Sequence, residues 1–237
     1  RAQGKGIFLF TKLSQISEWK ASNRFKPDGT VQESYVVQRY LENPLLIGGK
    51  KFDLRIYVLV LSYKPLRVYL YRSGFARFSG TRFSMRKEDI DNQFMHLTNV
   101  AIQKTGGNYD ARSGNKWEMR SLRVHMQSKH GAEAVDRLHD DMQLLIVRSL
   151  LAVANTMIQD KHCFELYGYD IIVDDALKPL LIEVNASPSL TSDTDADYAL
   201  KTGMLHDVLD IVDMDSLVNG AGGNTGGGRR GGGRSGG

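Results

Sequence analysis

The segment that most constrains the fold is residues 52–63, where apolar and other side chains alternate with a period of two. This alternation predicts a long β-strand, because successive side chains of a strand point to opposite faces of the sheet. Residues 66–71 are expected to pair with it across a short turn, which gives an antiparallel hairpin. Opposite the apolar face, Lys51, Asp53 and Arg55 point together. The apolar face consists of Phe52, Leu54, Ile56, Val58 and Val60.

A second hairpin is expected near the end of the chain, where residues 171–173 and 180–182 are apolar runs separated by turn-forming residues. Folding the pair about the midpoint of the turn places Asp170 opposite Glu183, with Cβ atoms roughly 5 Å apart, and Asn185 follows on the same face. Facing carboxylates repel unless a cation lies between them, and Mg²⁺ accepts oxygen ligands of this kind. The hairpin therefore predicts a magnesium site, with two solvated acids at the end of a sheet as the alternative.

The other elements indicate an α+β fold, with a largely antiparallel sheet and packed helices. Short strands are expected at residues 7–10 and 35–40, and a helix is expected at residues 13–19. A long helix is expected at about residues 132–158, where apolar side chains recur at helical spacing. We expect this helix to pack across the sheet.

Composition excludes several classes of protein. The chain has 237 residues and a single cysteine, Cys163, so an internal disulfide is excluded and a reducing compartment is expected. The longest apolar stretch, residues 144–154, contains Arg148 and is too short to cross a bilayer, so we expect a soluble intracellular protein. The six histidines have no zinc-binding spacing.

Charge is segregated along the chain. Three arginines of the glycine-rich segment 219–237 contribute most of the net charge of +4. Residues 216–237 are expected to be disordered, and they contain no aromatic side chain that could stack on nucleic-acid bases, so nucleic acid is not the expected partner. Residues 64–87 hold seven basic side chains and no acidic one, a stripe that would attract an anionic partner. The acidic run at residues 193–215 is expected to be solvated surface.

The Gly4-Lys5-Gly6 turn is a candidate for phosphate contact. Glycine lets backbone N–H groups approach an anion closely, and a lysine can reach its charge. The chain has neither a Walker-type loop nor a dinucleotide-binding fingerprint. Together with the charged face of the long strand and the acidic hairpin, the turn nevertheless indicates a nucleotide site.

At these positions the chain resembles the tubulin tyrosine ligase-like enzymes, which are ATP-grasp ligases. Within that family it is most similar to the ciliary tubulin polyglutamylases, which join glutamate to glutamate side chains of the acidic tubulin tail. The resemblance covers roughly residues 2–212 and implies an ATP-grasp-like fold. Six segments occur in the family's order: Ala2-Gln3-Gly4-Lys5-Gly6-Ile7, Val37-Gln38-Arg39-Tyr40-Leu41, Gly49-Lys50-Lys51-Phe52-Asp53-Leu54-Arg55-Ile56-Tyr57-Val58, His96-Leu97-Thr98-Asn99, Tyr167-Gly168-Tyr169-Asp170 and Leu181-Ile182-Glu183-Val184-Asn185-Ala186-Ser187-Pro188-Ser189.

The resemblance also implies roles for single residues. ATP would be contacted by Gln3, Gly4, Gln38, Arg39, Tyr40, Leu41, Lys51, Asp53, Thr98 and Asn99. Magnesium would be bound by Asp170, Glu183 and Asn185, and the incoming amino acid by Arg77, Lys104 and Lys201. The implied catalytic residues are Lys51 and Arg55, with Arg55 facing the acceptor carboxylate or the γ-phosphate.

The implied reaction transfers the γ-phosphoryl group of ATP to the acceptor glutamate. The amine of free L-glutamate then attacks the acyl phosphate, while Mg²⁺ neutralises the developing charge. The implied partner is tubulin in microtubules, without a membrane, and whether accessory subunits take part stays open. The implied location is the cytoplasm and cytoskeleton, including the axoneme or basal body of a cilium or flagellum.

The chain departs from the family at its start. It begins at Arg1 and lacks the family's N-terminal domain and a Lys-Pro segment whose lysine contacts ATP. We therefore expect residues 1–215 to be an N-terminally truncated domain that is inactive alone. Residues 1–41 would be the remainder of the nucleotide-covering lobe, and residues 42–215 the C-terminal lobe.

Two alternative functions stay open at this point. A tubulin glycine ligase would use the same ATP site, although Lys104 and Lys201 favour an amino acid with an anionic side chain. A non-catalytic microtubule-binding fragment would instead use the basic stripe of residues 64–87.

Overall fold

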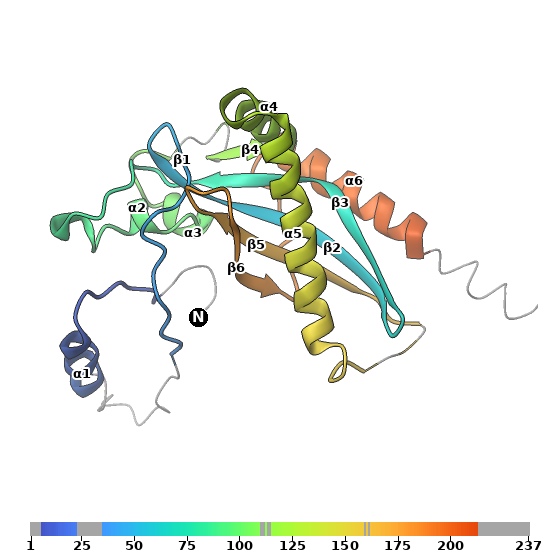
Figure 1. The fold of residues 1–237 in the computed structure, drawn as a ribbon, viewed down its shortest axis with the longest axis horizontal. Helices are drawn as coiled ribbons and strands as arrows, with labels where there is room; N and C mark the ends of the chain where they lie inside the picture. The colour runs from blue at the N-terminus through green and yellow to red at the C-terminus, as the bar shows by residue number, and fades with distance from the viewer. Residues whose placement is uncertain are drawn as a thin grey trace, which may run out of the picture.

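The computed structural model describes residues 6–22, 35–109, 112, 115–158, 160 and 162–212. These residues form a sheet backed by helices on both faces (Figure 1). The strands are β1 (Leu46–Ile47), β2 (Lys50–Tyr63), β3 (Leu66–Phe78), β4 (Lys116–Glu118), β5 (Glu165–Val173) and β6 (Pro179–Asn185). The α-helices are α1 (Leu13–Ser22), α2 (Gln93–His96), α3 (Val100–Gln103), α4 (Met119–His130), α5 (Ala132–Val153) and α6 (Asp195–Val212), with a 3₁₀ helix η1 at Lys87–Asp89.

The sheet has six antiparallel strands in the order β4-β3-β2-β5-β6, and β1 pairs with β2. The period-two segment is the central strand β2, and the hairpin near the end of the chain is β5-β6. The expected α+β class with an antiparallel sheet is confirmed, and it agrees with the ATP-grasp-like fold that the resemblance implies. The sequence-based estimate of the second strand was too short, since β3 continues to Phe78 beyond two irregularities in its pairing with β2.

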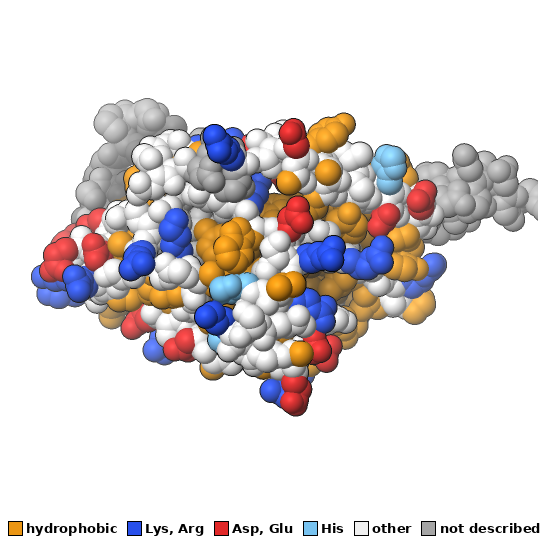
Figure 2. Space-filling model, turned by 90° about the horizontal axis from the view of Figure 1, so that it is seen from above, with side chains coloured by type: hydrophobic (Ala, Val, Ile, Leu, Met, Phe, Trp, Pro, Cys, Tyr) orange, Lys and Arg blue, Asp and Glu red, His pale blue; other side chains and the backbone are white. Residues whose placement is uncertain are grey.

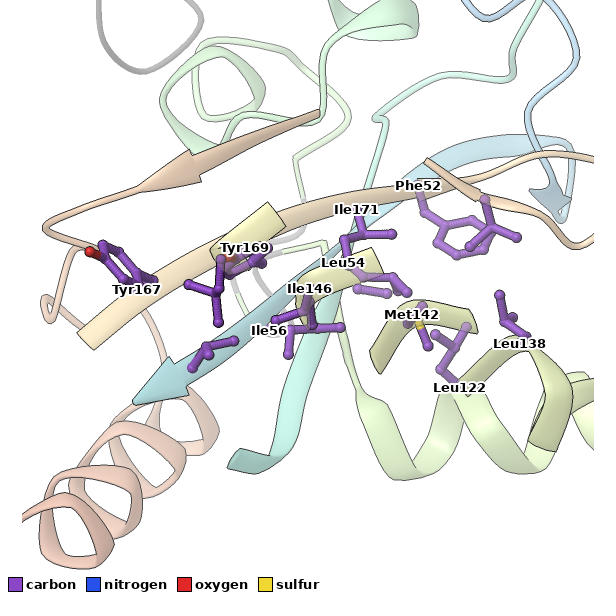
Figure 3. Close-up of a cluster of buried hydrophobic side chains, with 14 of the residues drawn as sticks. Phe52, Leu54, Ile56, Leu122, Leu138, Met142, Ile146, Tyr167, Tyr169 and Ile171 are labelled. Atoms are coloured by element: carbon purple, nitrogen blue, oxygen red, sulfur yellow. The ribbon is translucent and has the colours of Figure 1, made fainter. Parts of the chain in front are cut away.

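The main core lies between one face of the sheet and the helices α4 and α5. The apolar row of β2 packs there together with alternate residues of β5, including Tyr169 and Ile171 (Figure 3). Leu138, Met142, Ile146 and Leu150 of α5 face them at helical spacing, and all four are buried. The long helix that crosses the sheet is therefore confirmed, although it ends at Val153 rather than near residue 158.

The opposite face of the sheet is divided into two halves, and α6 packs on the apolar one. Lys51, Asp53 and Arg55 occupy the first half of β2, as the alternation predicts. In the second half the same face carries Tyr57 and Leu59, which form an apolar cluster with residues of α6. The cluster also contains Phe75, Met204, Val208 and Val212.

The prediction of two short strands near the start of the chain is wrong. Residues 7–10 and 35–40 have no strand assignment, and in Figure 1 the segment around α1 lies apart from the sheet. Aromatic side chains of both segments pack on Trp19 of α1 instead, with ring centroids 5.4 Å apart for Phe8 and Trp19 and 4.6 Å apart for Trp19 and Tyr35. The helix expected at residues 13–19 is confirmed as α1, where Gln15 Oε1 accepts hydrogen bonds from the backbone N–H groups of Thr11 and Lys12.

Several expectations lie outside the described residues or are untested by them. Gln3, Gly4 and the tail at residues 216–237 are not described, and the division into lobes at residue 41 stays a prediction. Among the described helices, none is long and apolar enough to cross a membrane.

Two adjacent leucines of α5 test the packing of this helix. Leu150 is 2% exposed in the main core, and Leu151 is 53% exposed. We expect Leu150→Ala to lower the free energy of unfolding by about 2–5 kcal/mol, because it leaves a cavity under the sheet. Leu151→Ala should change it by less than about 0.5 kcal/mol. Urea denaturation of both variants measures the difference, and equal effects would contradict the packing of α5 on the sheet.

Candidate functional site

The candidate site is a row of charged residues that crosses the sheet on the face toward α6. Strand pairing places Arg77 of β3 opposite Asp53 of β2, Arg55 of β2 opposite Asp170 of β5, and Asp170 opposite Glu183 of β6. Residues directly opposite each other in antiparallel strands point to the same face with adjacent side chains. The topology therefore brings together three regions of the chain that are far apart in sequence.

Four of these side chains form a buried ion-pair network. Arg77 Nε donates to Asp53 Oδ1 at 3.1 Å, and Arg77 Nη2 contacts both Asp53 Oδ2 and, at 2.8 Å, Asp170 Oδ2. Arg55 donates to the same aspartate through Nε, 2.5 Å from Oδ1, and through Nη2, 3.0 Å from Oδ2. Asp53, Arg55, Arg77 and Asp170 are all buried, so each charge depends on its partners for stabilisation.

The network sets the ionisation of its members. Burial alone would raise the pKa of Asp170, but the hydrogen bonds and charges of Arg55 and Arg77 outweigh it and lower that pKa. Burial would lower the pKa of Arg77, but Asp53 and Asp170 outweigh it and raise that pKa. Asp170 is therefore held as a carboxylate, and the cations that hold it are arginines that the hairpin argument did not consider.

The predicted pairing of Asp170 with Glu183 is confirmed. A bulge after Asp170 shifts the rest of the hairpin by one residue, so that Ile171 faces Leu181 instead of Ile182. Partial burial and then the charge of Asp170 raise the pKa of Glu183. A carboxylate with a raised pKa opposite a second carboxylate would be stabilised by a nearby cation.

Asn185 lies within reach of both carboxylates. Its Nδ2 is 3.5 Å from Asp170 Oδ2 and 3.4 Å from Glu183 Oε1, and it donates to the carbonyl of Gly168 at 3.2 Å. Rotation of the amide would exchange Nδ2 for Oδ1. Among the described residues no group of three His, Cys, Asp or Glu side chains converges. Two carboxylates and one carboxamide are nevertheless an oxygen donor set that fits a hard divalent cation, and their role as ligands stays a prediction.

Lys51 occupies the end of the charged face next to Tyr40. Lys51 Nζ donates to Tyr40 Oη at 3.1 Å and to the carbonyl of His96 at 2.8 Å, and it lies 4.7 Å from the centroid of the Tyr40 ring. Tyr40 Oη is also hydrogen-bonded to His96 Nδ1 at 2.9 Å. Burial lowers the pKa of Lys51 to about 8, with Asp53 opposing the shift. The protonation of Lys51 is therefore sensitive to the charge of any group that binds next to it.

The structure places the other expected nucleotide contacts as follows. Thr98, two residues after His96, is buried, and Asn99 is half-buried at the N-terminal end of α3. Leu41 is half-buried, whereas Gln38 and Arg39 are exposed. Of the expected ATP contacts, Tyr40 and Lys51 touch each other. The role of all these residues in ATP binding stays a prediction.

Lys104 and Lys201 belong to a second cluster, which also contains Lys116 and two aspartates. Lys104 Nζ lies 2.6 Å from Asp193 Oδ1, and Lys201 Nζ lies 3.0 Å from Asp197 Oδ2. Lys116 Nζ contacts both aspartates, at 3.3 Å from Asp193 and 3.0 Å from Asp197. The hydrogen bond to Asp193 raises the pKa of Lys104. Burial would raise the pKa of Asp193, but Lys104 and Lys116 outweigh burial and lower it.

The expectation of a solvated acidic run is wrong for Asp197, which is buried and paired with Lys116 and Lys201. Asp193 is exposed, although it is paired with Lys104 and Lys116. The spacing of Asp197 and Lys201 by four residues on a helix could have indicated this pairing. Lys116 could not have been found, because its place depends on the pairing of β4 with β3.

Lys116 and Asp197 also line a cavity of about 860 Å³ between β4, α4 and the start of α6. Its other walls include Phe75, Trp117, His125 and Leu200. The surface shown in Figure 2 has basic, acidic and apolar side chains interspersed. Arg77, one of the seven basic residues of the expected stripe, is buried in the ion-pair network, and the other six are exposed.

Comparisons with known proteins agree with the earlier resemblance. The model of the tubulin-tyrosine ligase family matches residues 1–219. The chain is 51% identical over 248 residues to "Probable tubulin polyglutamylase TTLL9" of Bos taurus, covering 93% of this chain and 53% of that protein. It is 48% identical over 214 residues to "Probable alpha-tubulin polyglutamylase Ttll1" of Tetrahymena thermophila, covering 90% and 52%. The chain thus spans about half the length of the curated relatives it matches.

Two isosteric substitutions in the β5-β6 hairpin test the ion-pair network. Asp170→Asn removes the charge shared by Arg55 and Arg77, and we expect it to lower the free energy of unfolding by about 3–5 kcal/mol. Glu183→Gln is the matched control on an exposed side chain, and it should change that free energy by less than about 1 kcal/mol. Chemical denaturation measures both, and a neutral Asp170→Asn would contradict the network.

Proposed function

Because the chain belongs to the tubulin-tyrosine ligase family, we propose that it forms part of an ATP-dependent ligase that joins glutamate to glutamate side chains of tubulin tails. The observation that carries the proposal is the buried Asp53/Arg77/Asp170/Arg55 network beside Glu183 and Asn185, all within the matched residues. The similarity to proteins described as probable tubulin polyglutamylases supports glutamate as the donor and tubulin as the acceptor.

In this proposal Asp170, Glu183 and Asn185 hold Mg²⁺, which when bound would neutralise charge on the β- and γ-phosphates. Lys51 would contact the phosphates, and its neighbour Tyr40 would lie at the nucleotide. Gln3, Gly4, Gln38, Arg39, Leu41, Asp53, Thr98 and Asn99 are the further proposed ATP contacts.

Arg55 is suited to orienting the reacting anions. Asp170 holds its guanidinium through two hydrogen bonds, which fix the plane of the group. A guanidinium carries five N–H donors, so Arg55 can stay paired with Asp170 while it contacts the acceptor carboxylate or the γ-phosphate. The acceptor carboxylate would be converted to an acyl phosphate, which the amine of L-glutamate then attacks with loss of phosphate.

Arg77, Lys104 and Lys201 are the proposed contacts of the incoming amino acid. Arg77 belongs to the ion-pair network, whereas Lys104, directly after α3, and Lys201 of α6 belong to the second cluster. We propose that the protein acts in the cytoplasm on the microtubule cytoskeleton, including the axoneme or basal body of a cilium or flagellum.

One observation favours a second candidate, a non-catalytic microtubule-binding module. Six basic residues of the stripe, Lys64, Arg67, Arg72, Arg82, Arg86 and Lys87, are exposed and could contact acidic tubulin tails. Microtubule binding that survives Glu183→Gln, together with no transfer by the wild type, would favour this candidate.

Mass spectrometry of tubulin tails tests the proposed reaction. The full-length protein is incubated with tubulin, Mg²⁺-ATP and labelled glutamate, with parallel reactions that contain labelled glycine or tyrosine. We expect glutamate on tail glutamate side chains with the wild type, and loss of more than about 99% of the product with Glu183→Gln, a variant expected to remain folded. Transfer of glycine alone would establish the glycine ligase instead, and undiminished transfer by Glu183→Gln would contradict the metal site.

The pKa of Lys51 predicts that nucleotide binding takes up a proton. In the free protein Lys51 titrates near pH 8 because it is buried. Bound phosphate would favour the charged amine and raise this pKa, so binding at about pH 8.5 should consume protons and weaken as the pH rises, whereas binding at about pH 6.5 should not consume protons. Isothermal titration calorimetry in buffers of different ionisation enthalpy measures the uptake. It should vanish in Lys51→Met, and uptake that persists in this variant would contradict the assignment.

A further inference from the structure

We propose that His96 is a positioning residue of the nucleotide site, because its ring holds the Tyr40 hydroxyl in the orientation in which Tyr40 accepts a hydrogen bond from Lys51. This inference rests on the proposed function, in which Lys51 contacts the phosphates, and it adds a residue that acts through Tyr40. It is carried by the hydrogen bonds of the His96 ring, by its burial, and by the contacts of Lys51.

The surroundings of the His96 ring favour its neutral form. His96 is 3% exposed, and the Phe83 ring lies edge-on to it with ring centroids 5.8 Å apart. Among the described residues, the titratable groups that face the ring are Lys51 of β2, Tyr40 before β1, and Asp89 of η1. Burial lowers the pKa of His96, the hydrogen bond to Asp89 opposes this shift, and the charge of Lys51 lowers the pKa further. His96 is therefore uncharged at neutral pH.

The hydrogen bonds of the neutral ring fix its tautomer. His96 Nε2 lies 3.0 Å from the backbone carbonyl oxygen of Asp89. A carbonyl oxygen can only accept, so Nε2 carries the proton and Nδ1 is left as an acceptor. Nδ1 lies 2.9 Å from Tyr40 Oη, and the Tyr40 hydroxyl therefore donates to it.

Tyr40 links the His96 ring to Lys51. Because the hydroxyl proton of Tyr40 points to His96, the oxygen is free to accept from Lys51 Nζ, which lies 3.1 Å away. The backbone carbonyl of His96 accepts a second N–H of Lys51 at 2.8 Å. An ammonium group has three N–H donors, so the described residues leave one for a bound phosphate. His96 thus holds Lys51 at two points, through its backbone and, by way of Tyr40, through its ring.

The loop that carries His96 is itself held in place by Gln103 of α3. Gln103 Nε2 donates to the carbonyl oxygens of Phe94 and Leu97, at 3.2 and 2.5 Å. Its Oε1 accepts from the backbone N–H of Gly80 at 2.8 Å, and the residue is 2% exposed. The His96 ring therefore stands on a fixed support next to the end of the sheet.

The hydrogen bond between Tyr40 and His96 also joins two segments of expected ATP contacts, residues 38–41 and residues 98–99. Residues 35–40 have no strand assignment, so sheet pairing does not hold Tyr40. Its side-chain contacts with His96 and Lys51 hold it instead. Loss of the acceptor at His96 should therefore disturb the nucleotide site without a change in any residue that contacts the nucleotide.

Two substitutions separate the two ring nitrogens of His96. In His96→Asn the side-chain oxygen takes the place of Nδ1 and can accept from Tyr40, whereas His96→Gln keeps a donor to the Asp89 carbonyl but leaves Tyr40 without its acceptor. Isothermal titration calorimetry measures the Kd of the full-length protein for Mg²⁺-ATP. We expect the Kd to rise about tenfold in His96→Gln and less than about threefold in His96→Asn, because the first variant loses one hydrogen bond that orients the site. His130→Gln, an exposed histidine at the end of α4, is the control and should bind as the wild type.

The same two substitutions in a Tyr40→Phe background test whether His96 acts through Tyr40. Without the hydroxyl, the two variants should bind Mg²⁺-ATP equally, because the residues at positions 40 and 96 then no longer interact. A purely structural role of His96 would keep the difference between them, and a persisting difference would contradict the inference. Calorimetry gives the Kd separately from the fraction of folded protein, so partial unfolding of a variant does not obscure the comparison.

Nuclear magnetic resonance of the wild type labelled with ¹⁵N-histidine measures the tautomer directly. We expect His96 Nδ1 without a proton at neutral pH, and a protonated Nδ1 would overturn the inference. Equal Kd values for His96→Gln and His96→Asn, or loss of binding in both, would overturn it as well, provided that the wild type binds Mg²⁺-ATP. A wild type that does not bind Mg²⁺-ATP would refute the proposed function itself, and the inference with it.

Discussion

The buried pairing of Asp53 and Asp170 with Arg77 and Arg55 is the interaction on which the rest of the structure depends. Each of these charges would be costly in the interior without its partners. Because the partners lie on three different strands, the network is satisfied in a single register of β3, β2 and β5. A slip of one residue would turn the charges toward α5 and the apolar row of β2 toward α6.

The buried side of the helix α6 changes from charged to apolar along its length, as does the sheet face that it faces. Its buried stripe begins with Asp197 and Lys201 and continues with Met204, Val208 and Val212. The sheet beneath changes in the same way, from the charged half of β2 to Tyr57 and Leu59. Asp197 of α6 pairs with Lys116 of β4, and the apolar residues of α6 pack on Tyr57 and Leu59, so the position of α6 on the sheet is fixed by both kinds of contact.

The local sequence pattern predicts those elements whose structure depends on residues that are close in sequence. It fails where the structure depends on a partner that is distant in sequence. The alternation of β2, the facing of Asp170 and Glu183, and the apolar spacing of α5 could all be read from neighbouring residues. Residues 35–40 have a strand-like composition but no strand to pair with in the described structure. The irregular pairing of β2 and β3 was equally hidden: a Cβ on Gly74 would lie 2.5 Å from the carbonyl oxygen of Arg55, so this close approach requires glycine.

The charge balance of the row constrains how a metal can enter the candidate site. Three acids, Asp53, Asp170 and Glu183, lie on the same face as three bases, Lys51, Arg55 and Arg77, so these six residues together are neutral without a cation. A bare divalent ion would leave two uncompensated positive charges beside buried arginines, which is costly at low local dielectric. A metal that arrives with the phosphates of a nucleotide brings its own compensating charge. The neutrality of these six residues therefore favours a metal–nucleotide complex over a permanently bound ion, which fits the proposed ligase reaction, in which the nucleotide is exchanged in every turnover.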